Sequence, residues 1–269
     1  MSFVYKPEYK ARLQAKLRPE KYWEKLAKVQ YTNRKDIHSP YSSDAVSQAL
    51  TKYAQYAYTT PTTTDDVLSI DTQLVIPELI DRADLVENGY VTAMNRADEQ
   101  AERIKLDLET KLWADAITNA GNTFDATGMT AANTANKLLG IQKLFIEANA
   151  KGKMSSNGIF LVINPTTQMT IAEYAGVSGF RVSDEEIRSG KVDRIQGFDI
   201  YVSNLLPAGK AIAGINKYSI DMAILRGTYG DVVFKEDPDR QSAHGIISRV
   251  DVGVHAFEKA KPTLIDISV

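Results

Sequence analysis

The sequence contains no cysteine among its 269 residues. Disulfide bonds, thiolate metal sites and a cysteine nucleophile are therefore excluded. No apolar run approaches the roughly 20 residues that a membrane-spanning helix needs, so we expect no membrane partner. The first residues, MSFVYKPEYKARLQ, lack the apolar region of a secretory signal. We therefore expect a protein that stays in the cytoplasm in which it is made.

Glycine is absent from the first part of the chain, and all 16 glycines lie at Gly89 or later. Tight turns of compact folds usually use glycine. We therefore expect the first third to consist of long, simple elements that reach out from a compact body. Within it, Thr59–Asp66 (TTPTTTDD) is typical of an exposed loop tip.

Motifs for catalysis are also missing. The three histidines are His38, His244 and His255, and the sequence has no G-x-S-x-G, H-E-x-x-H or Walker-type motif. Asp251 and His255 fall on a predicted strand, where a spacing of four residues separates them by about 13 Å. We expect no catalytic residue, no cofactor and no metal ligand, which favours a structural role.

The net charge of −2 hides an uneven distribution. Residues 1–35 carry ten Lys and Arg against three Glu, whereas the rest of the chain is acidic. A basic arm on an acidic body suggests an electrostatic partner for the arm, although lysines of this kind can also serve solubility alone.

Apolar periodicity predicts two short helices in this arm, at residues 8–18 and 20–29. Leu13 and Leu17 are one turn apart, as are Tyr22 and Leu26, and Pro19 suits the start of the second helix. Two short amphipathic helices cannot bury their apolar faces on each other alone. They need the body of the chain or a neighbouring molecule.

The strongest helical pattern covers about Val91 to Thr118. Apolar residues recur at steps of three and four along it: Met94, Ala97, Ala101, Ile104 and Leu108. This predicts an amphipathic helix of roughly seven turns, with a coiled coil as the second interpretation. A strand is predicted before it, from Val67 to Ile76, where Pro77 ends it. A helix at 44–58 is also predicted, although its composition would suit a strand as well.

The second half predicts alternating helices and strands. After a loop at Asn119–Ala132, a helix runs to about Ala150 with Gly152 as its C-cap, and its core face is Leu138, Leu139, Ile141, Leu144 and Phe145. Ile159–Ile163 (IFLVI) reads as a buried strand, followed by a short helix to about Tyr174. Ser183 and Glu186 form a capping box. Further strands are predicted at 198–202, 211–215, 232–234, 245–257 and 263–269.

Residues 182–207, VSDEEIRSGKVDRIQGFDIYVSNLLP, resemble a stretch of the Hong Kong 97-type major capsid proteins of tailed bacteriophages. The residues that carry the resemblance are Gly190, Val192, Ile195, Gly197, Phe198, Ser203, Asn204, Leu206 and Pro207. Residues 159–171 are similar to the strand and helix that precede this stretch in the family. The 91–118 helix is similar to the family's spine helix, and the likeness covers roughly residues 65–269.

The resemblance implies an α+β fold with four parts. These are a basic N-terminal arm (1–35), an extended loop region (36–80), a peripheral domain with the spine helix (81–130 and 236–269) and an axial domain (131–235). It implies pentamers and hexamers of this chain that form an icosahedral shell around double-stranded DNA, contacted non-specifically. A portal and a separate scaffolding protein, or no scaffold, are implied as partners, because the chain has no room for an N-terminal scaffolding domain.

Six residues are candidates for contacts between subunits: Leu13, Leu17, Tyr22, Trp23, Leu26 and Pro61. The arm would clamp a neighbouring subunit or, in the rival interpretation, face DNA or an acidic scaffold inside the shell. We favour the clamp, because leucines and aromatics at helical spacing need an apolar partner. A chain that starts at Asp36 would then fold but form no stable shell. An encapsulin-like compartment protein and an unrecognised α/β hydrolase remain alternatives.

Overall fold

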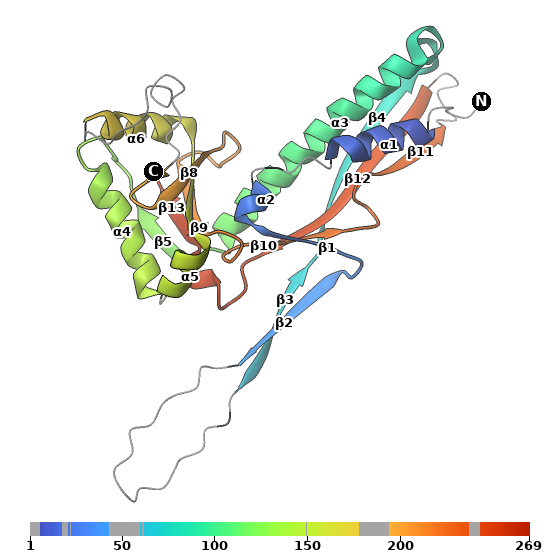
Figure 1. Ribbon diagram of the computed structural model, residues 1–269. Helices are drawn as coiled ribbons and strands as arrows, with labels where there is room; N and C mark the ends of the chain where they lie inside the picture. The colour runs from blue at the N-terminus through green and yellow to red at the C-terminus, as the bar shows by residue number, and fades with distance from the viewer. Residues whose placement is uncertain are drawn as a thin grey trace, which may run out of the picture.

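The computed structural model describes residues 6–17, 21, 23–42, 60, 62–148, 150–177, 194–236 and 243–269. Figure 1 shows a long part with a helix laid along a sheet, a compact part at one end of it, and a two-stranded ribbon that projects from the body. Within the described residues, no helix is both long and apolar enough to cross a membrane. The predicted helix at 44–58 and the capping box at Ser183 lie outside the described residues.

The long part is built on a five-stranded sheet centred on β12 (Ala243–His255). One edge of β12 pairs with β4 (Thr72–Asp81). Its other edge pairs directly with two strands, with β11 (Asp231–Glu236) along its first part and with β10 (Asp221–Leu225) at its end. These pairings are antiparallel, whereas β1 (Lys28–Thr32) adds to β10 in parallel. The arm therefore contributes the strand β1 to the sheet. The strands β10, β11 and β12, which follow most of the compact part in the chain, form the rest of it together with β4.

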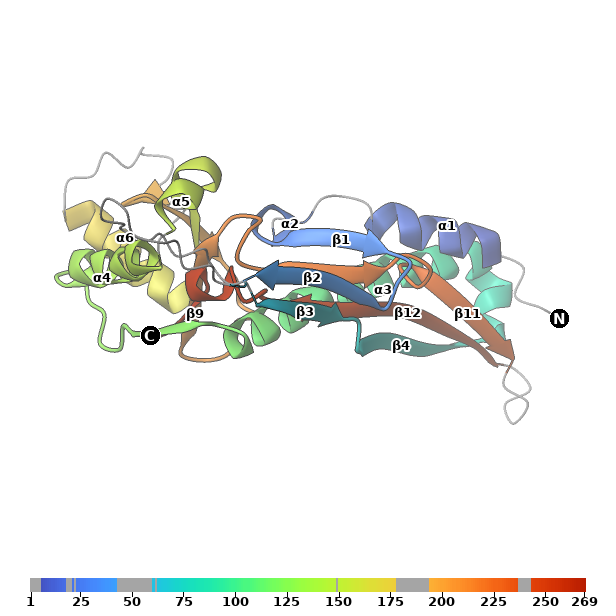
Figure 2. The same cartoon turned by 90° about the horizontal axis from the view of Figure 1, so that it is seen from below.

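Helix α3 (Arg82–Thr118) covers one face of this sheet (Figures 1 and 2). The apolar stripe predicted from the sequence is buried along it, from Met94 to Leu112. The helix begins at Arg82, nine residues before the predicted start at Val91. Sequence periodicity missed this part because its polar residues, such as Glu87 and Asn88, interrupt the apolar stripe.

The compact part holds a six-stranded sheet in the order β5-β13-β9-β6-β8-β7. Its strands are β5 (Asn122–Asp125), β6 (Ile159–Ile163), β7 (Arg194–Ile195), β8 (Phe198–Val202), β9 (Lys210–Ile215) and β13 (Ile265–Ser268). The helices here are α4 (Thr134–Glu147), α5 (Lys151–Asn157) and α6 (Pro165–Val177), and a single turn of 3-10 helix (Lys261–Thr263) precedes β13.

The continuous apolar run of β6 is explained by burial on both faces. Ile159, Leu161 and Ile163 belong to a cluster with α4 and α6, whereas Phe160 and Val162 belong to the cluster that contains α3. Successive side chains of a strand point to opposite faces, so a strand buried on both sides carries no polar alternation. Strand β6 therefore lies between two hydrophobic cores and contributes side chains to both.

Several predicted boundaries in the first third were wrong. The second arm helix is one turn, α2 (Trp23–Leu26), and Lys28–Thr32 is the strand β1, because its β-branched and aromatic residues fit the edge of the sheet beside β10. Pro77 does not end a strand. It lies within β4 opposite Ile247, which is tolerated because β4 is an edge strand with β12 as its partner.

The 67–76 segment forms two strands, β3 (Thr63–Ser69) and β4, and β3 pairs with β2 (Asp36–Ser42) to form the projecting ribbon. Thr63–Asp66 therefore belongs to a strand and not to a loop tip. In the compact part, Gly152 lies inside α5 and does not cap α4, and Leu139 is 53% exposed although the helical pattern assigned it to the core. Leu139 sits on the outer side of a helix whose buried face is set by Leu138, Ile141 and Phe145.

Sheet membership also departs from the expected division of the chain. β10 and β11, expected in the axial domain, pair with β12 in the sheet of the long part. β13, expected with the peripheral domain, pairs with β5 and β9 in the compact part. Strands β12 and β13 belong to different sheets because the segment between them leaves one sheet and enters the other. This segment is a turn followed by the 3-10 helix that contains Pro262.

Candidate functional site

The arm is the first candidate element, and it lies against its own chain. Helix α1 (Lys6–Leu17) packs along α3 with Tyr9, Leu13 and Leu17 fully buried. These side chains are four residues apart, so they form one stripe on the helix. Trp23 and Leu26 of α2 continue the same buried cluster. We call residues 6–17 and 23–26 together the strap.

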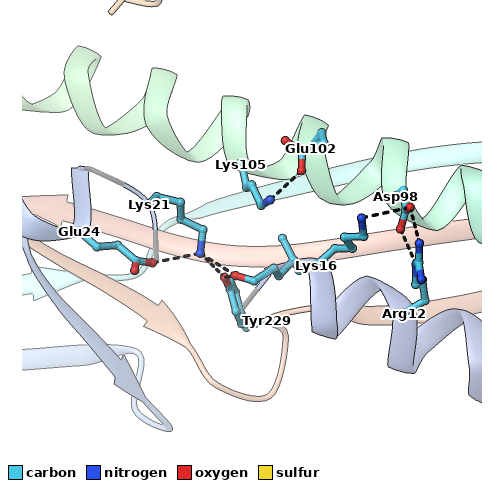
Figure 3. Close-up of polar contacts among 9 residues, drawn as sticks. Arg12, Lys16, Lys21, Glu24, Asp98, Glu102, Lys105 and Tyr229 are labelled. Carbon is cyan, nitrogen blue, oxygen red and sulfur yellow. Dashed lines mark hydrogen bonds and ion pairs between the residues drawn. The ribbon is translucent and has the colours of Figure 1, made fainter. Parts of the chain in front are cut away.

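Three basic residues of helix α1 pair with acids of the body, and two of these pairs are shown in Figure 3. Arg12 donates two hydrogen bonds of 2.8 Å to the carboxylate of Asp98 on α3, and Lys16 lies 3.4 Å from the same carboxylate. Lys10 bonds Asp231 at the start of β11 at 2.9 Å. The bonds from Arg12 lower the pKa of Asp98 below its ordinary value. Much of the basic charge of the arm is thus used within the chain.

Lys21 lies between α1 and α2 in the chain and forms hydrogen bonds with both helices. Its Nζ donates to the Leu17 carbonyl oxygen at 2.7 Å, to Glu24 Oε1 at 3.0 Å and to the Tyr229 hydroxyl at 2.8 Å (Figure 3). The Tyr229 hydroxyl donates in turn to the Leu17 carbonyl oxygen at 2.9 Å. The side chain of Lys21 is only 8% exposed, so three acceptors compensate for its loss of water. Burial also raises the pKa of Tyr229 to about 12.

Four of the six residues expected at subunit contacts lie inside their own chain in the structure. Leu13, Leu17, Trp23 and Leu26 are buried in the core of their own chain and present no accessible surface to a neighbour. Their helical spacing predicted that they pack against an apolar surface. In the structure this surface is formed by α3 and the five-stranded sheet of the same molecule. Tyr22 and Pro61 lie outside the described residues. A clamp on a neighbour through the four buried side chains would require the strap to leave its own body.

The ribbon formed by β2 and β3 is the second candidate element. It is held at its base by Asp66, whose carboxylate bonds His255 Nε2 at 2.8 Å and accepts from the Glu258 backbone N–H at 2.7 Å. Nearer its outer end, His38 bonds Asp65 at 2.6 Å in an exposed pair. Both described histidine side chains thus hold acids of the ribbon. Sequence reasoning missed this role because the partners lie far apart in the chain.

The third candidate element is the face of the five-stranded sheet that α3 leaves uncovered. Leu74 and Ile76 of β4 pack toward α3, so the alternating residues Val75 and Leu79 point to the opposite face and are exposed. Val233 of β11 and Ile247 of β12 lie on this face as well, because they are paired with each other and with Pro77 across the sheet. We call these five residues (Val75, Pro77, Leu79, Val233 and Ile247) the open sheet face.

A polar junction joins α3 to the compact part. The buried Glu109 carboxylate accepts from the Trp113 indole N–H at 3.1 Å and from the Ser203 hydroxyl at 2.6 Å. Ser203 belongs to the segment that resembled the capsid family. In that segment Gln196 and Gly197 both have positive φ and form the two-residue turn between β7 and β8. The recognised motif therefore encodes a hairpin and the junction, while Gly190 and Val192 lie outside the described residues.

The alternative of a hydrolase requires a deep pocket that contains a perturbed acid or base. Within the described residues, the cavity beneath α4 and α6 has a volume of about 10 Å³ and an apolar lining. The described residues also contain no group of three or more His, Cys, Asp or Glu side chains that could hold a metal ion.

The comparisons with known proteins agree with this geometry. The sequence model of the family described as "Phage capsid protein" matches residues 71–261, well over half of the chain. No curated protein matches the sequence.

Solved structures with a similar fold come from several shells. That of Mycobacterium phage Che8 is 18% identical, with a TM-score of 0.66 over 87% of this chain and 84% of that one. The capsid of an empty GTA particle is 12% identical, with a TM-score of 0.67 over 91% and 88%. A virus-like particle from Pyrococcus furiosus is 14% identical, with a TM-score of 0.60 over 97% and 98%. From the family match and this shared fold, we conclude that the chain belongs to the phage capsid protein family, as a major capsid protein with the Hong Kong 97-type fold.

Proposed function

We propose that the chain assembles through heterologous contacts into pentamers and hexamers, which form an icosahedral shell around the double-stranded DNA of a tailed phage. The observation that carries this proposal is the pair of unlike surfaces on one subunit. The ribbon projects from the body (Figures 1 and 2). The open sheet face, on a different part of the subunit, presents the exposed apolar side chains of Val75, Leu79 and Val233. Unlike surfaces that meet head to tail generate rings, whereas a self-complementary patch closes a dimer.

The exposed apolar side chains support a role in contact. Val75 is 42% exposed and Leu79 is 52% exposed on an edge strand whose outer backbone groups have no strand partner in the described chain. Such an edge invites association unless it is covered. A neighbouring subunit would cover it in a shell. A separate scaffolding protein, a portal and non-specific contact with packaged DNA belong to the same proposal, as does assembly in the host cytoplasm.

Electron microscopy of the purified, expressed protein tests the proposal. We expect closed particles of uniform size with rings of five and six subunits. Leu79→Lys should fold with an unchanged melting temperature but fail to assemble, because the ammonium group would be desolvated in the contact. Val91→Lys on α3, a similar change at a side chain that is 61% exposed, is the control and should assemble. A monodisperse monomer at high concentration under every salt condition would contradict the proposal.

The encapsulin-like alternative shares the fold, so the fold cannot separate the two functions. The family match favours the phage capsid. The contents of particles isolated from the native host distinguish them, because a phage shell holds genomic DNA and a compartment holds a protein cargo.

A further inference from the structure

An open pocket of about 340 Å³ lies where the strap meets the compact part. It is lined by Lys25 of α2, Asn157 at the end of α5, Tyr201 of β8, and Asn216 and Lys217 of the turn between β9 and β10. Each of these side chains carries an N–H or O–H donor, and no carboxylate lines the pocket. A lining of this kind favours an anion.

The backbone around the pocket is fixed by bonds between its two sides. The side-chain amides of Asn157 and Asn216 each donate to the other's backbone carbonyl oxygen, at 3.0 Å in both directions. Lys217 has a φ of 54°, a conformation that lysine seldom adopts, and its backbone N–H donates to the Leu26 carbonyl oxygen at 2.6 Å. The strap and the turn thus hold the pocket in shape before any ligand arrives.

The two lysines differ from those elsewhere in the strap. Lys10 and Lys16 form ion pairs with acids of the body, and the nearby Lys21 pairs with Glu24 of α2, whereas Lys25 and Lys217 form none within the described residues. One carboxylate does lie close by: Asp199 Oδ2 approaches Gly158 beside the Asn216 amide, while its Oδ1 lies 3.6 Å from Arg194, and Asp199 does not line the pocket. Two exposed lysine side chains therefore line one pocket whose lining contains no carboxylate, so a bound anion would be attracted by both.

We propose that this pocket binds a phosphate group. A tetrahedral, multiply charged oxyanion can accept bonds from several directions, and lysine binds phosphate as a point charge. The bound group would connect Lys25 of the strap with Lys217, which precedes β10, and with the compact part. Free inorganic phosphate and the phosphodiester of DNA offer the same chemistry. The proposal goes beyond shell assembly and does not depend on it.

Calorimetric titration of the full-length chain tests the site, with inorganic phosphate in one arm and a short DNA duplex in the other, at constant ionic strength. The variants are Lys25→Gln and Lys217→Asn, since asparagine tolerates the left-handed backbone conformation. Lys143→Gln is the matched control, because it removes the same charge from α4, which contributes no residue to the pocket. Melting curves without ligand show whether each variant keeps its fold.

We expect saturable binding of inorganic phosphate at one site, weakened at least about tenfold by each pocket variant and unchanged by the control. If the duplex loses affinity in the same two variants, the site also receives the phosphates of DNA. If only inorganic phosphate is affected, the site serves the free anion. Absence of saturable binding, or equal binding by the pocket variants, the control and the wild type, would overturn the proposal.

Discussion

At the scale of single residues, Gly253 decides how closely the ribbon approaches the sheet. A Cβ atom at this position of β12 would lie 2.2 Å from the carbonyl oxygen of Ser69, the last residue of β3 before the turn to β4. Neither partner can move freely, because both atoms belong to backbone held by strand pairing. The missing side chain therefore lets two segments 184 positions apart in the sequence pack directly against each other.

Gly253→Ala should lower the free energy of unfolding by about 1–3 kcal/mol, as overpacking does. Gly176→Ala in α6 is the control, because a Cβ there would meet nothing within 4 Å. That change should be neutral or slightly stabilising, since alanine favours helix more than glycine does. Chemical denaturation of both variants measures the difference, and equal stabilities would show that the turn can shift without cost.

Leu108 and its neighbour Asp107 test the orientation of α3. Leu108 is fully buried, whereas Asp107 faces outward and forms an ion pair with Arg103 at 3.1 Å. Leu108→Asp should abolish soluble folding, because an unpaired buried charge costs several kcal/mol, a large share of the stability of a domain. Asp107→Ala should change stability by no more than about 0.5 kcal/mol. Soluble yield and thermal melting measure both effects. Similar melting temperatures of the two variants would contradict the assignment of Leu108 to the buried face of α3.

At the scale of elements, the strap depends on its charges as well as on its apolar stripe. Asp98 accepts from Arg12 and lies beside Lys16, and the pKa of its carboxyl group is lowered in the folded chain. A lowered folded pKa means that the stabilisation is present above the unfolded value of about 3.9 and is lost as pH falls through the lower folded value. Acid should therefore loosen α1 from α3.

Hydrogen exchange of the α1 amides measures this loosening. The wild-type chain should protect α1 at neutral pH and lose protection below about pH 4. Asp98→Asn should reduce protection at neutral pH and remove most of this pH dependence. Glu102→Gln is a suitable control, because Glu102 bonds Lys105 on its own helix and none of the described strap residues. An unchanged pH profile in Asp98→Asn would show that the apolar stripe alone holds α1.

The base of the ribbon depends on Asp66 more than on Asp65. The Asp66 side chain is 11% exposed and satisfies both His255 and a backbone N–H, whereas the pair of Asp65 and His38 is about half exposed. Asp66→Ala removes the acceptor of two hydrogen bonds, one of them part-buried, and should cost about 1–3 kcal/mol. Asp65→Ala should cost less than about 1 kcal/mol. Denaturation and exchange of the β2–β3 amides report the effects, and comparable losses in the two variants would contradict this assignment.

At the scale of the whole molecule, one core connects the strap, α3, the five-stranded sheet and one face of the compact part. Tyr9, Leu13, Leu17, Trp23 and Leu26 all belong to it. A chain that starts at Asp36 would lose these side chains and also β1. The expectation that such a chain folds but fails to assemble therefore changes.

The truncated chain should be insoluble or lack fixed tertiary packing, because each large buried side chain contributes about 1.5–3 kcal/mol through burial. Near-ultraviolet circular dichroism and soluble yield measure this. A well-folded truncated chain would show that the strap is dispensable for the subunit and would restore the interpretation in which it acts on a neighbour.

The local patterns of the sequence predicted the elements whose periodicity is uninterrupted. The stripe from Met94 to Leu108 predicted the central turns of α3, and the run Ile159–Ile163 predicted a buried strand. The resemblance of residues 182–207 indicated the capsid fold, and in the described part of that stretch a two-residue turn and a short polar exit need particular residues at fixed spacing. The absence of glycine before Gly89 predicted an outreaching first third; the ribbon fits this prediction, whereas α1, α2, β1 and β4 pack into the body.

The tertiary structure alone decided which partner each of these elements uses. Arg12 and Lys16 lie on one helical face and imply an acidic partner, but periodicity cannot say whether that acid is Asp98 of the same chain or an acid of a neighbour. Likewise, the apolar stripe of α1 predicts that this face is buried but does not say which surface covers it. Local spacing fixes the face of a helix or strand, whereas its partner depends on contacts across 86 residues in the case of Arg12 and 189 in that of Asp66. Such contacts exist only once the chain has closed on itself.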